Sequence, residues 1–202
     1  MKNKISLLVL IPALCISLLA FVEGGLKVGD TAPDFNLKNI DGKEMSMADF
    51  GQAKGFIVVF TCNTCPYSVM YEDRIIAANN KYAPMGYPVI AINPNDVNRR
   101  PGDSFAEMKA RAKEKGFNFP YLYDSTQEVA MAYGATRTPH VYLLDKARTV
   151  QYIGAIDNNA SEASEVTEDY LAESIAAMEA GKKPDPNFTK AVGCTIKWKE
   201  SK

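Results

Sequence analysis

The stretch GFIVVFTCNTCPYS, residues 55–68, joins an apolar run to two closely spaced cysteines. The run Gly55–Phe60 is too short for a free-standing helix and contains no polar side chain, so we expect a strand buried on both faces of a parallel sheet. Cys62 and Cys65 follow it directly. Two thiols at this spacing can form a reversible disulfide, supply half of a metal site, or serve as a static structural staple.

The residues after the first cysteine predict a helix from Asn63 to about Tyr82, because apolar side chains recur there with helical spacing. Pro66 falls in the first turn of this predicted helix, where its missing N–H costs nothing. A helix N-terminus stabilises a thiolate and lowers its pKa. A strand, the cysteine pair and a helix in this order favour reversible thiol chemistry, and we expect the helix to make the first sulfur, on Cys62, acidic and reachable.

The rest of the chain alternates predicted strands with predicted helices. An Asp41-Gly42 turn between two short alternating segments indicates a hairpin. Further strands are predicted at 88–93, 121–123, 140–145 and 150–157, the last two as an antiparallel hairpin, and further helices at 104–115, 125–133 and 165–180. This order predicts one α/β domain with a mixed sheet over residues 26–181. Residues 182–202 are predicted to form a linker and an extended tail, in which Cys194, Ile196 and Trp198 share one face.

The N-terminal segment, residues 1–24, has the pattern of an export signal. Lys2 and Lys4 precede a long apolar stretch that ends in small residues. An uncleaved membrane anchor is the alternative, because the apolar stretch has the length of about 18 residues at which a helix can span a bilayer. We expect a periplasmic or extracellular protein with no membrane contact beyond this segment.

The composition excludes one functional class and directs attention to the thiols. The formal net charge of −1 and the lack of a Lys/Arg block argue against a nucleic-acid-binding protein. After loss of Cys15 with the signal, three cysteines remain, an odd number in a compartment where disulfides persist. A domain of this size needs no staple, so we interpret Cys62 and Cys65 as a working redox pair.

Four ordered motifs resemble those of the thioredoxin-like superfamily, and more narrowly its branch of exported thiol–disulfide oxidoreductases and alkyl hydroperoxide reductase/thiol-specific antioxidant redoxins. They are TAPDFNL at 31–37, CNTCP at 62–66, YGATRTPH at 133–140 and VYLLD at 141–145. The resemblance covers about residues 28–156. It implies a three-layer α/β sandwich, with helices on both faces of a mixed central sheet and an N-terminal β-hairpin.

The resemblance also implies roles for individual residues. Cys62 would be the exposed attacking thiolate, and Cys65 would be the thiol that resolves the mixed disulfide. The bond between Thr138 and Pro139 would be the cis X-Pro bond that faces the pair and positions the substrate backbone. The implied activity is thiol–disulfide exchange with protein or small-thiol substrates. Electrons would come from a redox partner, and no organic or metal cofactor is expected.

A thiol peroxidase is the enzymatic alternative. Peroxiredoxins place a Thr or Ser three residues, and a Pro seven residues, before the cysteine that reacts with peroxide. Before Cys62 these positions hold Val59 and Gly55, and before Cys65 they hold Cys62 and Val58. A peroxide pocket is therefore not predicted.

A metal-binding protein, such as a copper chaperone, is the alternative from a different class. Cys62, Cys65, His140 and Cys194 are the ligands that such a site could use. The close pair supplies only two ligands and the chain has a single histidine, which follows Pro139. We therefore predict no metal site.

Three auxiliary residues each have two interpretations. His140 is either a satisfied strand residue or a general acid/base near the thiols. Arg137 is either a solvated loop residue or a cation that favours a thiolate. Cys194 is either a small buried hydrophobic residue or a third redox thiol that could form a disulfide with the active pair.

Overall fold

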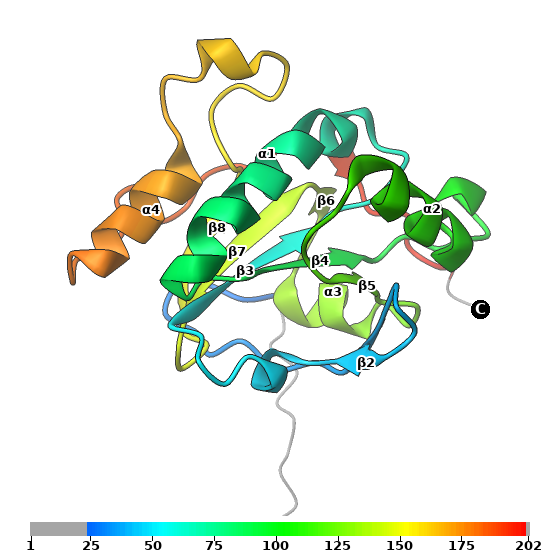
Figure 1. Ribbon diagram of the computed structural model, residues 1–202, viewed down its shortest axis with the longest axis horizontal. Coiled ribbons are helices and arrows are strands. Elements are labelled where there is room, and N and C mark those ends of the chain that lie inside the picture. The colour runs from blue at the N-terminus through cyan, green and yellow to red at the C-terminus, as the bar shows by residue number, and fades with distance from the viewer. Residues whose placement is uncertain (1–23, 201–202) are drawn as a thin grey trace, which may run out of the picture.

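A seven-stranded mixed sheet in the order β2-β1-β5-β4-β3-β7-β8 forms the centre of the protein, and a separate two-stranded sheet pairs β6 with β9 (Figure 1). The computed structural model describes residues 24–200. The strands are β1 (Leu37–Asn39), β2 (Glu44–Met45), β3 (Gly55–Phe60), β4 (Val89–Asn93), β5 (Tyr121–Tyr123), β6 (Arg137–Thr138), β7 (His140–Asp145), β8 (Val150–Gly154) and β9 (Cys194–Thr195). The helices are α1 (Pro66–Tyr82), α2 (Phe105–Lys115), α3 (Glu128–Tyr133) and α4 (Tyr170–Glu179).

Strand β3 is the centre of this sheet, and all six of its residues are buried. It pairs in parallel with β4 and antiparallel with β7. A strand with sheet neighbours on both sides and helices on both faces has no contact with water, which explains its uninterrupted apolar sequence. The prediction of a buried central strand at residues 55–60 is confirmed.

Side chains of β3 alternate between two hydrophobic clusters, one on each face of the sheet. Ile57 and Val59 pack with apolar residues of α1, α2 and α4. Val58 and Phe60 pack with α3, with the segment before β1 and with Ile196 of the C-terminal tail. Figure 1 shows the corresponding layers, with α1 and α3 on opposite sides of the sheet. The predicted mixed sheet with helices on both faces is confirmed, and β1 and β2 form the predicted N-terminal hairpin.

Three helices begin later than their sequence patterns predicted, and one of them is α3, which starts at Glu128 rather than residue 125. Helix α1 starts at Pro66 rather than Asn63, and α4 starts at Tyr170 rather than residue 165. Before α4, residues 163–165 form a separate 3₁₀ turn. Asp169 then caps α4, because its carboxylate accepts a hydrogen bond from the backbone of Ala172.

The predicted export signal, residues 1–24, lies outside the described residues except for its last position. Within residues 24–200, none of the helices combines the length and the apolar character that crossing a membrane requires.

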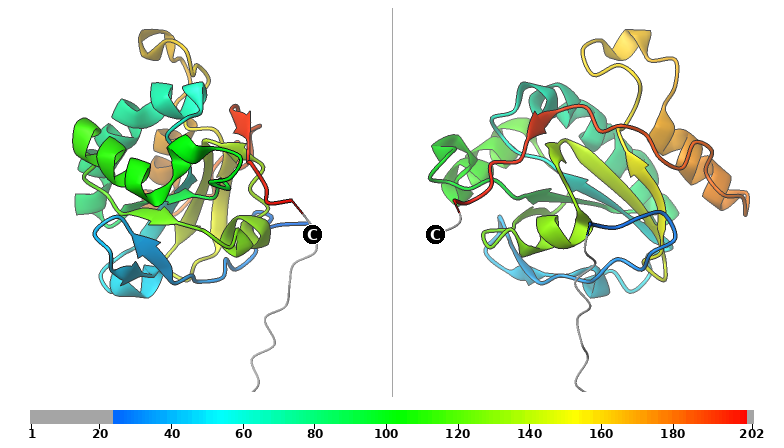
Figure 2. Two further views of the ribbon diagram at one scale, coloured as in Figure 1. Left: turned by 90° about the vertical axis from the view of Figure 1, so that its right-hand side faces the viewer. Right: turned by 180° about the vertical axis from the view of Figure 1, so that it is seen from behind.

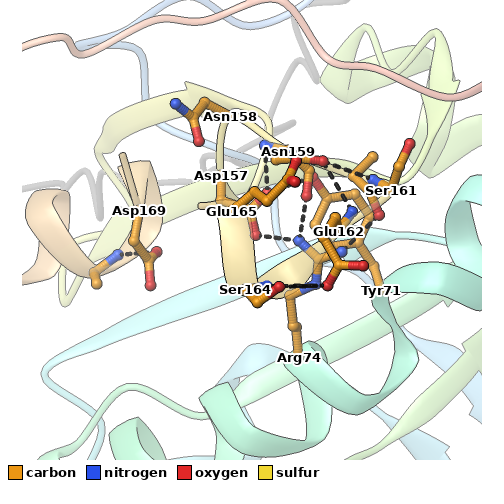
Figure 3. A network of polar contacts seen from close by, with 12 residues as sticks. Tyr71, Arg74, Asp157, Asn158, Asn159, Ser161, Glu162, Ser164, Glu165 and Asp169 are labelled. Carbon is orange, nitrogen blue, oxygen red and sulfur yellow. Dashed lines mark hydrogen bonds and ion pairs between the residues drawn. The ribbon is translucent and has the colours of Figure 1, made fainter. Parts of the chain in front are cut away.

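A buried ion pair fixes α1 to the loop that follows β8 (Figure 3). The Arg74 guanidinium donates to the Asp157 carboxylate at 2.6 Å and to the backbone carbonyls of Asn159 and Ala160 at 2.7 and 2.6 Å. The Tyr71 hydroxyl donates to the other Asp157 oxygen at 2.7 Å. Asp157 is 5% exposed. Each charge thus has hydrogen-bonding partners on α1 or on the loop, and the orientation of α1 depends on them.

Replacing Arg74 with Met is expected to lower the free energy of unfolding by about 3 kcal/mol, because the buried Asp157 carboxylate loses its cation. Lys54→Met is the matched control, because Lys54 pairs with Glu179 at the surface, where its side chain is 58% exposed, and such pairs contribute little. Urea unfolding of the two variants measures the difference. Equal effects of the two substitutions would contradict the role assigned to Arg74.

Candidate active site

The two cysteines lie in different local structures, because Pro66 decides where α1 begins. A proline disfavours helical backbone in the residue before it, and it fits the first helical position well. Cys65 accordingly has extended backbone, with φ −77° and ψ 123°, and is the N-cap residue of α1. Cys62 follows the end of β3, where the Thr61 N–H still bonds to the Ile92 carbonyl of β4 at 2.8 Å. Only the second sulfur therefore sits at the helix N-terminus.

The expectation of an exposed Cys62 is wrong for this structure. Cys62 and Cys65 are each 3% exposed. The Cys62 sulfur lies 3.3 Å from Thr138 Oγ1 and 3.9 Å from Ser68 Oγ, within the core at the edge of the sheet. Its burial follows from its position, because it comes just after the end of β3 and lies against the buried side chains of Thr138 and Ser68.

The segment before Pro139 faces both cysteines. The Thr138–Pro139 peptide bond is cis. Thr138 is fully buried; its hydroxyl contacts Cys62, and its carbonyl oxygen lies 3.1 Å from Cys65 Sγ. The cis bond and its position beside the pair agree with what the sequence resemblance implies. Thr138 is the residue that brings the two sulfurs into one site.

The contacts of the two sulfurs shift their pKa values in opposite directions. The hydrogen bond to Cys65, burial and the nearby Asp103 carboxylate raise the pKa of Cys62. The hydrogen bond from Cys62 lowers the pKa of Cys65 against the opposing effect of burial. The backbone N–H of Cys194, 3.3 Å from Cys65 Sγ, and the N-terminus of α1 act in the same direction. The Thr138 carbonyl is the one contact that favours a protonated Cys65. The assignment of the attack to Cys62 stays a prediction.

Asp103 is a site residue that the sequence analysis missed. It is fully buried, and one of its carboxylate oxygens accepts the backbone N–H groups of Asn63 and Thr64 at 2.8 and 3.1 Å. The other oxygen accepts the Thr64 hydroxyl and the Asn95 side chain at 2.8 and 2.7 Å. Three of these four hydrogen bonds come from Asn63 and Thr64 and fix the loop between the two cysteines. One signal in the sequence could have identified Asp103: it is an acidic residue in the loop after β4. Strands β3 and β4 are parallel, so this loop and the cysteines lie at the same edge of the sheet.

The C-terminal tail covers the cysteine pair. Strand β9 pairs antiparallel with β6, so that Cys194 lies opposite Thr138. Figure 2, in its right-hand view, shows the tail (red) crossing the side of the molecule that carries α3. Ile196 is 3% exposed and belongs to the core on that side. The tail is therefore packed into the domain, and it contributes to the burial of the sulfurs.

The two remaining auxiliary residues have partners other than the thiols. Arg137 donates from its guanidinium to the Gly193 carbonyl at 3.2 Å, so it holds the tail. His140 is buried, which lowers its pKa to about 4, and the Thr136 backbone N–H donates to its Nδ1 at 3.4 Å. A neutral, backbone-bound imidazole fits the interpretation of His140 as a satisfied strand residue. Across residues 24–200, no three His, Cys, Asp or Glu side chains are arranged to hold a metal ion.

Comparison with known proteins places this site in a redox family. The AhpC/TSA family model matches residues 28–153. The thiol-disulfide oxidoreductase ResA of Geobacillus thermodenitrificans is 29% identical over 75% of this chain and 84% of its own. A crystal structure of an uncharacterized conserved protein from Geobacillus kaustophilus superimposes with a TM-score of 0.82 at 35% identity, over 87% of this chain and 94% of its own.

A more distant structure supports the fold assignment. It is a thiol:disulfide interchange protein of the thioredoxin family from Chlorobium tepidum, with a TM-score of 0.53 at 21% identity, over 64% of this chain and 87% of its own. The strand order, the cis bond beside the cysteines and the similarity to these proteins all indicate the same fold. The chain has a thioredoxin-like α/β fold and belongs to the AhpC/TSA family.

Proposed function

We propose that this protein is an exported thiol–disulfide oxidoreductase in which Cys62 attacks the substrate and Cys65 resolves the mixed disulfide. The observation that carries the proposal is the contact of both sulfurs with Thr138, with Cys65 at the N-cap of α1. The family match and the likeness to a thiol-disulfide oxidoreductase support the same reaction class. Export rests on the signal pattern of residues 1–24.

The reaction proceeds by two exchanges. The Cys62 thiolate attacks one sulfur of a substrate disulfide and forms a mixed disulfide, while the other substrate sulfur leaves with the electron pair. The Cys65 sulfur then attacks Cys62, so that a Cys62–Cys65 disulfide forms and the second substrate sulfur leaves as a thiolate. The pair gives two electrons to the substrate. A redox partner protein or a small thiol must restore them, and no metal or organic cofactor takes part.

The surface beside Cys65 suits a protein substrate. Tyr67 and Met70, in the first turns of α1, are 38% and 47% exposed. Exposed apolar side chains next to a reactive group provide a docking surface for a partner chain. Strand β6 lies next to the same sulfur and could pair with an extended substrate segment when β9 is displaced.

The acidity of the cysteine pair can be measured in the reduced protein. Thiolate absorbance in the ultraviolet is expected to persist into mildly acidic solution, because the hydrogen bond between the two sulfurs stabilises one thiolate in the pair. The Cys62→Ser and Cys65→Ser variants each remove this sulfur–sulfur hydrogen bond, so each is expected to lose the absorbance below about pH 8, as ordinary thiols with a pKa of about 8.5 do. Cys194→Ser is the control that keeps the pair. A wild-type titration at the ordinary thiol pKa would contradict a thiolate shared by the pair.

The attacking sulfur can be identified by activity. Cys62→Ser is expected to lower the rate of reduction of a model disulfide at least about a hundredfold, since it removes the nucleophile itself. Cys65→Ser is expected to keep the first exchange and to form a covalent adduct that intact-mass measurement detects. An adduct on the Cys62→Ser protein would instead assign the attack to Cys65.

The Asp103 carboxylate is expected to tune the redox equilibrium. Asp103→Asn removes a buried negative charge that disfavours a thiolate on Cys62, so the reduced pair becomes more stable and the protein more oxidising. Each unit of pKa corresponds to a tenfold change, and we expect a shift of about tenfold in the glutathione equilibrium. Asp96→Asn is the control, because Asp96 lies on the same loop and bonds to Asn98. A shift toward the disulfide would contradict this role.

A peroxidase is the rival activity within the same family. Cys62 and Val58 stand at the two positions before Cys65 that carry a hydroxyl and a proline in peroxiredoxins. Peroxide turnover with a thiol reductant tests the rival directly. Turnover of peroxide faster than turnover of disulfides would replace the proposed function.

A further inference from the structure

The C-terminal tail brings a third thiol into contact with the cysteine pair. The backbone N–H of Cys194 donates to Cys65 Sγ at 3.3 Å. The pairing of β9 with β6 places Cys194 opposite Thr138, whose carbonyl oxygen lies 3.1 Å from the same sulfur. Strand pairing and the direct contact are separate constraints, and both place Cys194 beside Cys65. Cys65 is therefore the member of the pair that the tail reaches.

The tail is attached to the domain on both sides of Cys194. Before β9, the Thr189 N–H bonds to the Ile153 carbonyl of β8 at 3.0 Å. After β9, the Lys197 N–H donates to the Asn95 side chain at 2.8 Å. These attachments hold the third thiol in register with the pair.

Gly193 allows β9 to approach β6 closely. A Cβ atom at this position would lie 2.2 Å from the Thr138 carbonyl oxygen and 2.7 Å from its carbonyl carbon, both of them backbone atoms. The Gly193 carbonyl in turn accepts a hydrogen bond from Arg137 at 3.2 Å. The tail thus fits closely against the residue that contacts both sulfurs of the pair.

The three thiols differ in their exposure to solvent. Cys62 and Cys65 are each 3% exposed, whereas Cys194 is only partly buried. A disulfide between Cys62 and Cys65 therefore lies beneath the docked tail, where a further thiol has little access. A disulfide that includes Cys194 is closer to the surface.

We propose that Cys194 takes over the disulfide of the pair: it attacks Cys65 in the Cys62–Cys65 disulfide and sets Cys62 free. This inference rests on the proposed function, which supplies the Cys62–Cys65 disulfide. In the step, a bond forms between the sulfurs of Cys194 and Cys65, and the bond between Cys65 and Cys62 breaks. The Cys62 sulfur leaves with the electron pair and takes up a proton, and the Cys194 thiol has given up its own. No electrons enter or leave the chain, and the product has a Cys65–Cys194 disulfide and a reduced Cys62.

The transfer exposes the disulfide to the redox partner that restores the electrons. A thiolate of this partner attacks the Cys194 sulfur, and Cys65 leaves with the electron pair. A second thiol of the partner then attacks the partner sulfur bound to Cys194 and releases Cys194. Thiols of low pKa leave faster in such exchanges. The hydrogen bond from Cys62 lowers the pKa of Cys65, which makes Cys65 a good leaving group in this reduction.

The transfer is expected to become faster as the pH rises. Burial, followed by the hydrogen bond and the charge of Cys65, raises the pKa of Cys194 to about 11 in the reduced protein. The Cys62–Cys65 disulfide removes the charge of Cys65, but burial remains, so Cys194 stays mostly protonated at neutral pH. Its thiolate fraction, and with it the transfer rate, is expected to increase about tenfold per pH unit between about pH 5 and pH 8.

The experiment follows the position of the one free thiol in the oxidised chain. All chains carry Cys15→Ser, which leaves the three thiols of the site as the only cysteines. The reduced parent chain is oxidised at about pH 5 with one equivalent of dipyridyl disulfide, which reacts with thiols in acid, and the pH is then raised to about 8. Samples are quenched with acid, alkylated and digested under non-reducing conditions. Alkylation is expected to move from Cys194 to Cys62 with time, while a Cys65–Cys194 disulfide appears.

Two matched variants separate the thiol from the strand that carries it. Cys194→Ser is expected to keep the Cys62–Cys65 disulfide and to give no alkylated Cys62 at either pH. Gly193→Val keeps all three thiols but displaces β9, and its transfer is expected to be at least about tenfold slower, because the effective concentration of Cys194 at Cys65 falls. Arg137→Ala removes the hydrogen bond to the Gly193 carbonyl without added volume, and it replaces the valine variant if that one fails to fold.

Alkylation that stays on Cys194 at every time and at both pH values would overturn the inference. The proposed function would survive that result, because the Cys62–Cys65 disulfide is the product that it requires. Failure of the parent chain to form a Cys62–Cys65 disulfide at about pH 5 would instead contradict the proposed function. Transfer as fast in the Gly193 and Arg137 variants as in the parent chain would overturn the role of β9.

Discussion

The start of α1 at Pro66 is the constraint on which the rest of the site depends. A proline at the first helical position forces the preceding residue out of helical backbone, so Cys65 becomes the N-cap and Cys62 stays with the sheet. The two sulfurs therefore differ in solvation and in hydrogen-bond donors, although only two residues separate them. One sulfur receives the donors of the helix end and of the tail, and the other lies near a buried carboxylate. A pair with this asymmetry has a defined order of reaction.

The asymmetry is maintained by polar contacts that lie within a largely apolar core. Asp103 fixes the loop between the cysteines, and Thr138 contacts both of them. On the other side of α1, Arg74 ties the helix to the loop that carries Asp157. Each of these groups is buried or partly buried and bonded to more than one partner. Such networks restrict the positions that the sulfurs can take, which matters more for an exchange reaction than the stability they add.

The fold could be predicted from the sequence because its signals are local. The apolar run of β3, the Asp41-Gly42 turn and the repeated change from strand to helix identify a mixed sheet with helices on both faces, and the structure has both. The position of the cis bond also followed from a motif. The chain alone gave no reason to place β6 beside residues of the tail, which are more than fifty positions away in sequence.

The site was predicted less well than the fold, and Pro66, Asp103 and Cys194 show why. Pro66 was placed inside a helix that began earlier, so the extended backbone of Cys65 and its position as the N-cap of α1 were not predicted. Asp103 was missed because its partners include backbone groups of a loop that is distant in sequence. Such contacts leave no repeating pattern of apolar and polar residues in the sequence. Cys194 was recognised as a candidate, but its distance from Cys65 depends on the pairing of β9 with β6.

The burial of Ile196 has a consequence for how this oxidoreductase responds to its surroundings. That side chain belongs to the same core cluster as Phe60 of the central strand, and it lies two residues from the cysteine that touches Cys65. Lifting the tail to admit a partner therefore also uncovers part of the core. Binding of a partner at the sulfurs and release of the C-terminal tail are thermodynamically coupled, so a partner that binds the sulfurs weakens the packing of the tail. A partner that binds the released tail makes the sulfurs accessible by the same factor.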